Sequence, residues 1–213
     1  MRVRGDYYGD GYALLEGLLP GEVVTAFLRQ LMTDMKQANI ALDSYEKSSA
    51  ILQRAAVEIY GYQYKPMITF LWGLTPIVSH LVGRDLLPTY NYFRIYRRGD
   101  ICRVHSDRFA CEHSLSLTLS YSDGTPWPLE MASTPVEAAE PITPDFGAAP
   151  HAALAMNPGD AVLYQGARYR HGRVQPNPND WSAHMFLHWV DRNGPYAAEA
   201  FDQRGIGTVA TNS

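Results

Sequence analysis

The sequence is poor in cysteine, in lysine and in long uninterrupted hydrophobic runs. Its 213 residues include only two cysteines, Cys102 and Cys111, which fits a reducing cytoplasm and excludes a disulfide framework. Because the two cysteines lack a CxxC spacing, we interpret them as small buried residues. They flank a His-x-Asp pair, which leaves metal binding as the alternative.

The longest apolar stretch, residues 67–83, is interrupted by Pro76 and His80. This pattern predicts a buried helix and not a membrane span. The N-terminal segment carries several charges and no unbroken apolar run, so we expect no signal peptide and a cytoplasmic protein. A net charge of -4 gives no reason to expect nucleic acid or an anionic membrane as a partner.

Hydrophobic content of 46% and charged content of 19% are typical of an ordinary folded protein. We expect one domain over residues 1–213, with a helical support region at 1–88 and a β-rich core at 89–191. Apolar residues recur at helical spacing in 20–38, and further helices are predicted at about 49–60 and 67–83.

From residue 89 the hydrophobic period changes from that of a helix to that of a strand. Strands are predicted at 89–96, 101–105, 113–121, 152–156, 161–164 and 182–190. Residues 122–151 hold 6 of the 14 prolines and are expected to form a long irregular connection, apart from a short piece at 127–131. The fold class is therefore mainly β with N-terminal helices (α+β), a sandwich or barrel covered by helices.

The stretch 113–121, HSLSLTLSY, alternates strictly between large apolar side chains and hydroxyls. A hydroxyl-lined face suits either a barrel strand that borders a wet cavity or an antiparallel strand with one face in solvent. This strand alone favours the solvent face.

The stretch RVHSDR, residues 103–108, places His105 and Asp107 two positions apart near a strand end. Two imidazoles and one carboxylate form the ligand set of a non-haem Fe(II) oxygenase, which leaves coordination positions open. A lone His-x-Asp pair is a weak signal. The third ligand would come from a distant strand, and the candidates are His80, His113, His151, His171, His184 and His188.

His171 lies in PGDAVLYQGARYRHGRVQP (158–176), where a Pro-Gly-Asp turn precedes an apolar strand. Together with YFRIYRRGDICRVHSD (92–107) and the closing strand SAHMFLHWVD (182–191), this segment resembles the Fe(II)/2-oxoglutarate-dependent dioxygenases, and among them the prolyl-4-hydroxylase-like branch. The two ligand segments stand in the right order, which makes the combination far more specific than His-x-Asp alone.

The resemblance implies a double-stranded β-helix (jelly roll) in which His105, Asp107 and His171 hold Fe(II). It also implies that 2-oxoglutarate and O2 are cosubstrates, and that a small-molecule or peptide substrate is hydroxylated with release of succinate and CO2. The cofactor supplies the difficult chemistry, while the protein supplies ligation and orientation.

The sequence departs from the family pattern at the anchor of the second 2-oxoglutarate carboxylate. Family members carry an Arg or Lys nine to twelve residues after the distal histidine, where residues 178–183 here contain no cation. All lysines lie in the N-terminal part of the chain, so we expect the anchor to be an arginine. The chain has only three lysines: Lys36, Lys47 and Lys65.

Arg173 is the first choice for the anchor because an arginine fork suits a carboxylate. Arg94, Arg108 and His184 are the alternatives to Arg173. Tyr96 matches the family tyrosine that donates a hydrogen bond to the same carboxylate. The competing interpretations are a solvated loop residue for Arg173 and a core aromatic for Tyr96.

Two other functions use the same three ligands. One is a non-catalytic metal-binding or sensing jelly roll, which the missing last-strand cation favours. The other is a zinc hydrolase, which ranks last because no glutamate follows His105 or His171 at helical spacing to serve as general base. The sequence leaves the substrate and the oligomeric state open.

Overall fold

The computed structural model describes residues 1–138 and 140–202. The helices are α1 (Gly21–Gln37) and α2 (Pro66–Val82), and short 3₁₀ turns lie at Leu42–Tyr45, Phe109–Cys111 and Ala197–Glu199. The strands are β1 (Arg2–Arg4), β2 (Tyr12–Glu16), β3 (Glu46–Lys47), β4 (Ala56–Tyr60), β5 (Leu86–Arg97), β6 (Cys102–His105), β7 (His113–Tyr121), β8 (Leu129–Pro135), β9 (His151–Leu154), β10 (Ala161–Tyr164), β11 (Tyr169–Arg173) and β12 (Trp181–Asp191).

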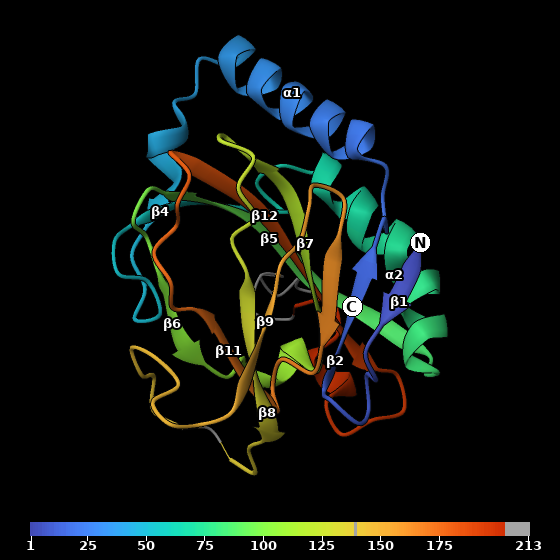
Figure 1. Cartoon of the computed structure of the whole chain (residues 1–213). Coiled ribbons are helices and arrows are strands. Elements are labelled where there is room, and N and C mark those ends of the chain that lie inside the picture. Colours follow the sequence, from blue (N-terminus) through green and yellow to red (C-terminus); the bar gives the residue numbers. More distant parts are fainter. Residues whose placement is uncertain (139, 203–213) are drawn as a thin grey trace, which may run out of the picture.

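The strands form two antiparallel sheets (Figure 1). The larger sheet has eight strands in the order β1-β2-β10-β7-β12-β5-β4-β3, and the smaller one has four in the order β6-β11-β8-β9. Strands far apart in the sequence are neighbours, because β12 pairs with both β5 and β7. The expected mainly-β fold with helices is confirmed.

The two helices cover the outer face of the eight-stranded sheet (Figure 1). α1 buries Val24, Phe27 and Leu31, while α2 buries residues such as Met67 and Leu71. These side chains share one apolar cluster with the outward-facing residues of the central strands, Phe93, Leu115, Leu117, Leu119, Met185 and Leu187. This cluster is the main hydrophobic core.

The opposite face of β7 points between the two sheets. Ser114, Ser116 and Thr118 are all fully buried there. The Ser116 hydroxyl reaches Arg173 of the smaller sheet. The interpretation of this hydroxyl face as solvent-exposed is therefore wrong, because the second sheet covers it.

The N-terminal region differs from the helical expectation. Residues 49–60 do not form a helix; they contain β4, whose residues 57–60 pair with β5. Val57 and Ile59 pack into the main core while Glu58 and Tyr60 lie on the other face, a period of two that suits a strand. The four strands β1 to β4 all lie within the region expected to be helical.

The connection 122–151 is more ordered than its proline content suggested. β8 runs from Leu129 to Pro135 and pairs with both β11 and β9. Thr143 forms an isolated bridge with Val104, next to His105. This segment therefore builds part of the smaller sheet, because pairing with β11 satisfies its backbone polar groups.

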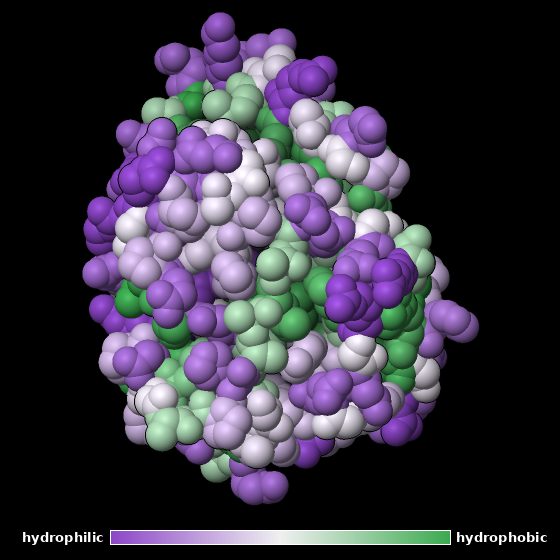
Figure 2. Space-filling model, viewed as in Figure 1, coloured by the Kyte–Doolittle hydropathy of each residue, from purple (hydrophilic) through white to green (hydrophobic). Residues whose placement is uncertain are grey.

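No helix in the described residues is long and apolar enough to cross a membrane. On the face seen in Figure 2, hydrophobic areas are small and lie between hydrophilic side chains. Scattered apolar residues of this kind are normal on a folded protein and need no partner.

We predict that Gly159→Ala destabilises the fold by at least about 1–3 kcal/mol. Gly159 has φ +92°, and an added Cβ would lie 2.2 Å from the Leu19 carbonyl oxygen. Gly73, inside α2, has open space where a Cβ would go, so Gly73→Ala is the matched control and should stabilise by up to about 1 kcal/mol. Urea unfolding of both variants checks this, and equal stabilities would contradict it.

Candidate metal centre

The antiparallel pairing of β6 with β11 brings two distant histidines together. In the register of this pair, His171 stands opposite His105. Their rings are 4.5 Å apart between centroids, and both side chains are buried. Residues that are 66 positions apart in the sequence thus become neighbours on one face of the smaller sheet.

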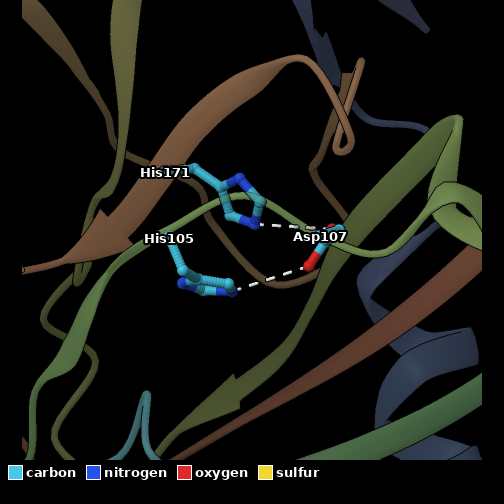
Figure 3. A group of neighbouring side chains, drawn as sticks. All are labelled: His105, Asp107 and His171. Atoms are coloured by element: carbon cyan, nitrogen blue, oxygen red, sulfur yellow. Dashed lines mark ion pairs between the residues drawn. The ribbon is translucent and has the colours of Figure 1, made fainter. Parts of the chain in front are cut away.

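Asp107 completes the group just beyond the end of β6. Its backbone N–H donates to the Gly166 carbonyl at 2.9 Å, which fixes the loop. Its Oδ1 lies 3.5 Å from His105 Nε2, and its Oδ2 lies 3.5 Å from His171 Nε2, with both rings turned toward the carboxylate (Figure 3).

The spacing of these ligand atoms suits one metal ion. The three ligand atoms all lie within 4.8 Å of one another. With bonds of about 2.1 Å, adjacent ligands of one ion are about 3–3.5 Å apart. Two imidazoles and one carboxylate also leave the rest of the coordination sphere open.

The remaining ring nitrogens are engaged with the backbone. Nδ1 of His105 lies 2.8 Å from the Arg103 carbonyl oxygen, and Nδ1 of His171 lies 3.0 Å from that of Tyr169. Because a carbonyl only accepts, each Nδ1 carries the proton, which leaves the Nε2 lone pair for a cation. Such backbone partners orient metal-binding histidines.

The electrostatics of the three groups also favour a cation. Burial alone would raise the pKa of Asp107, yet His171 and His105 lower it well below its usual value. Burial lowers the pKa of His105, with His171 adding to the effect, so this ring stays neutral. For His171, burial opposes protonation, but the Asp107 carboxylate raises its pKa above the usual value. The carboxylate therefore stays charged inside the protein.

A second group shares the same carboxylate. Asp107, Cys111 and His188 also have ligand atoms within 4.8 Å of one another. Burial raises the pKa of the Cys111 thiol well above its usual value, and the negative charge of the nearby Asp107 raises it further. Since the thiolate is the metal ligand, this keeps Cys111 a poor donor and makes the first group the better metal site.

Apart from His188, the other candidate histidines lie elsewhere in the described part of the chain. His80 is exposed on α2, and His151 is exposed and stacks on Phe146. His113 faces the outer side of the sheet, where its Nδ1 lies 2.6 Å from the Tyr7 hydroxyl. His184 lies on β12 beside Arg173.

Arg173 is buried on β11, so its interpretation as a solvated loop residue is wrong. It is 1% exposed, and its guanidinium lies 5.3 Å from the ring centre of Trp127. One terminal nitrogen lies 3.3 Å from His184 Nδ1 and 3.5 Å from the Ser116 hydroxyl, while Nε has no hydrogen-bond partner in the part of the chain that the structure describes. Within residues 1–138 and 140–202, no carboxylate forms an ion pair with it.

The two alternative arginines are already paired. Arg94 donates through Nε and a terminal nitrogen to Glu58, and through the other to the Tyr96 hydroxyl at 2.8 Å. Arg108 lies 3.0 Å from the Asp202 carboxylate. Burial, followed by the charge of Arg173, lowers the pKa of His184 well below its usual value, so this ring is neutral.

Sequence reasoning named His188 among the candidate ligands but did not place it, or Ser114, beside Asp107. The Ser114 hydroxyl and the His188 ring face this carboxylate from β7 and β12. Alternation along each strand could have placed both residues on the inner face, since Ser114 shares a face with Ser116 and His188 with His184. Only the pairing of the strands shows that they meet.

The sequence matches no protein-family model and no curated protein. Solved structures do match. The carbocyclase SnoK from nogalamycin biosynthesis, described as non-heme and alpha-ketoglutarate dependent, is 11% identical with a TM-score of 0.67, over 87% of this chain and 81% of that one. A Pseudomonas putida prolyl-4-hydroxylase is 16% identical with a TM-score of 0.58, over 89% and 96%.

HygX from Streptomyces hygroscopicus, with nickel and 2-oxoglutarate bound, is 12% identical with a TM-score of 0.61, over 87% of this chain and 84% of that one. Similarity at these identities establishes the fold. The chain therefore has the fold of iron- and 2-oxoglutarate-dependent oxygenases, as the sequence motifs predicted.

We predict that the protein binds one divalent ion per chain through His105, Asp107 and His171. Alanine at any of the three should abolish stoichiometric Co(II) or Fe(II) binding, because the other two ligands alone hold the ion weakly. His151→Ala removes an exposed histidine and is the matched control. Metal analysis after gel filtration checks this, and full occupancy in His171→Ala would show that the ligand set is wrong.

Proposed function

We propose that this protein is an Fe(II)- and 2-oxoglutarate-dependent dioxygenase of the prolyl-4-hydroxylase-like branch. It hydroxylates a small-molecule or peptide substrate and releases succinate and CO2. The observation that carries the proposal is the meeting of His105, Asp107 and His171 at spacings that suit one ion. The solved structures with this fold add support, since several are named as enzymes of this class.

The proposal includes one oxygenase domain built as a double-stranded β-helix. Two facing antiparallel sheets support this description, with the metal residues on the smaller sheet and the helices outside the larger one. In this description the proposed site would lie between the two sheets, where side chains of both sheets would exclude water.

Fe(II) is the ion that this ligand set fits, and when bound it supplies the activation of O2 coupled to oxidation of 2-oxoglutarate. The protein's own contribution is to hold His105 and His171 with Nε2 free and Asp107 ionised. The three remaining positions of a six-coordinate ion would stay open for the cosubstrate and O2.

Arg173 is the residue that would hold the far carboxylate of 2-oxoglutarate. A buried cation with no carboxylate partner is costly, so an incoming carboxylate would relieve that cost. Arg173 follows His171 by two residues on β11, about 7 Å along the strand, which suits a five-carbon diacid. Arg94 and Arg108 already have carboxylate partners.

Tyr96 would add a hydrogen bond to the same carboxylate. Its hydroxyl accepts from Arg94, so its own proton is left for another acceptor. Its ring packs edge-on against Trp127 and against His184. These buried aromatic rings keep water away from Arg173, which strengthens its attraction for an anion.

The proposed function is tested by anaerobic loading with Fe(II) and 2-oxoglutarate, followed by exposure to air and measurement of succinate. We expect slow substrate-independent succinate formation that needs both Fe(II) and O2 and that disappears in His171→Ala. Screening peptides, amino acids and small metabolites for stimulation of this turnover would identify the substrate. Tight metal binding without any succinate would favour the non-catalytic metal-binding protein.

We predict that Arg173→Ala weakens 2-oxoglutarate binding roughly 30- to 150-fold, since a hydrogen-bonded charge contributes about 2–3 kcal/mol. Tyr96→Phe should weaken it only a few-fold, and Co(II) binding should survive in both. The control is Arg192→Ala, which removes an exposed arginine paired with Asp85. Calorimetry with the Co(II)-loaded protein measures this. Unchanged affinity in Arg173→Ala, with a large loss in Arg108→Ala, would identify a different anchor.

A further inference from the structure

The metal-facing carboxylate of Asp107 has a second set of neighbours. One of its oxygens, Oδ2, lies 3.5 Å from the Ser114 hydroxyl on β7. The same hydroxyl lies 2.9 Å from Nδ1 of His188 on β12 and 3.2 Å from the Cys111 carbonyl oxygen. Groups from β7, from β12 and from the 3₁₀ turn at Phe109–Cys111 thus meet on one side of the Asp107 carboxylate, which follows β6 of the smaller sheet.

These hydrogen bonds run in one direction, with His188 donating to Ser114 and Ser114 donating to Asp107. Burial lowers the pKa of His188 to about 4, so the ring is neutral and carries one proton. Its Nε2 is buried and has no hydrogen-bond partner among the described residues, so a proton there would be an unsatisfied buried donor, whereas a proton on Nδ1 can be donated to Ser114. Ser114 then has its own proton to donate, and the charged Asp107 is a stronger acceptor than the neutral Cys111 carbonyl.

The His188 ring is held in place on its other side. The ring of Tyr90 lies 4.6 Å away between centroids, and the Tyr90 hydroxyl lies 3.2 Å from the Cys111 sulfur. His188 and Ser114 are also 2% and 0% exposed, so water does not compete for their hydrogen bonds. The pair is therefore built as a rigid unit.

The loop that holds the backbone of Asp107 is shaped for the same contact. A Cβ on Gly166 would lie 2.5 Å from Asp107 Oδ2 and 2.6 Å from the Ser114 hydroxyl. Glycine at this position lets the carboxylate and the hydroxyl approach each other, while its carbonyl accepts the Asp107 N–H. The Gly166 carbonyl thus fixes the backbone of Asp107, and the Ser114 hydroxyl lies beside its carboxylate.

We propose that Ser114 and His188 form a positioning pair that orients the Asp107 carboxylate toward the metal. The inference rests on the proposed metal site. Ser114 holds Oδ2, which leaves Oδ1 as the freer oxygen for the ion and favours ligation through one oxygen. Ligation through a single oxygen keeps one more coordination position open than ligation through both, which the binding of 2-oxoglutarate and O2 needs.

The test measures Co(II) affinity by chelator competition and the visible absorption of bound Co(II), in the full chain without 2-oxoglutarate. Ser114→Ala and His188→Phe should each weaken binding roughly 10- to 100-fold and change the absorption, because the number and geometry of the ligands change. Since the two residues act through one hydroxyl, the double variant should be no more than a few-fold weaker than Ser114→Ala. If the losses of Co(II) affinity in the two single variants multiply in the double variant, the two residues act independently and the proposed coupling between them is wrong.

Rescue separates positioning from mere packing. His188→Asn keeps an N–H donor close to Nδ1 and should bind Co(II) within a few-fold of the wild type, whereas His188→Phe fills the same space without a donor. Ser120→Ala removes a half-buried hydroxyl further along β7, opposite Ala183; it is the control and should leave affinity and absorption unchanged. If Ser114→Ala fails to fold, the His188→Asn and His188→Phe pair decides the matter alone.

The outcomes for the pair and for the enzyme are distinct. Wild-type affinity and absorption in both Ser114→Ala and His188→Phe would overturn the positioning role, whatever the turnover. A wild-type protein that binds Co(II) but forms no succinate would overturn the proposed function and leave the positioning role intact. A wild-type protein that binds no Co(II) would overturn both.

Discussion

The antiparallel pairing of β6 with β11 is the constraint on which the rest of the site depends. It places His171 opposite His105, with both Nε2 atoms turned toward Asp107. A slip of one residue would send His171 to the other face of the sheet. The pairing of β8 on the far side of β11 secures this register, which is why the proline-rich segment after β7 belongs to the structure of the site.

Buried charge is the second constraint, and the two buried arginines meet it differently. Arg94 is neutralised by Glu58 and so contributes a fixed hydrogen bond to Tyr96. Arg173 lies on Trp127 and beside the neutral His184, with its positive charge unpaired among the described residues. An unpaired charge in a folded protein lowers stability, and such exceptions concentrate at functional sites.

Strong local patterns in the sequence predicted the observed helices and strands, and weak ones did not. The helical period of 20–38 and the strand alternation in 113–121 both correspond to observed elements. The sequence predicts a helix at about 49–60, but Val57 and Ile59 instead bury one face of a strand that pairs with β5. Tertiary pairing overrides a marginal local preference in so short a segment.

By itself the sequence predicted which residues would bind a metal, since the His-x-Asp pair and the distal His171 stand in two recognisable segments. It also predicted an arginine as the anchor for the far carboxylate of 2-oxoglutarate, because the lysines lie elsewhere in the chain. Only the tertiary structure decided which arginine lacks a partner and which face of β7 turns inward. It also placed Ser114 and His188 beside Asp107. The physical reason is that burial and pairing depend on which strands are neighbours, and residues far apart in the chain become neighbours only through the packing of two sheets.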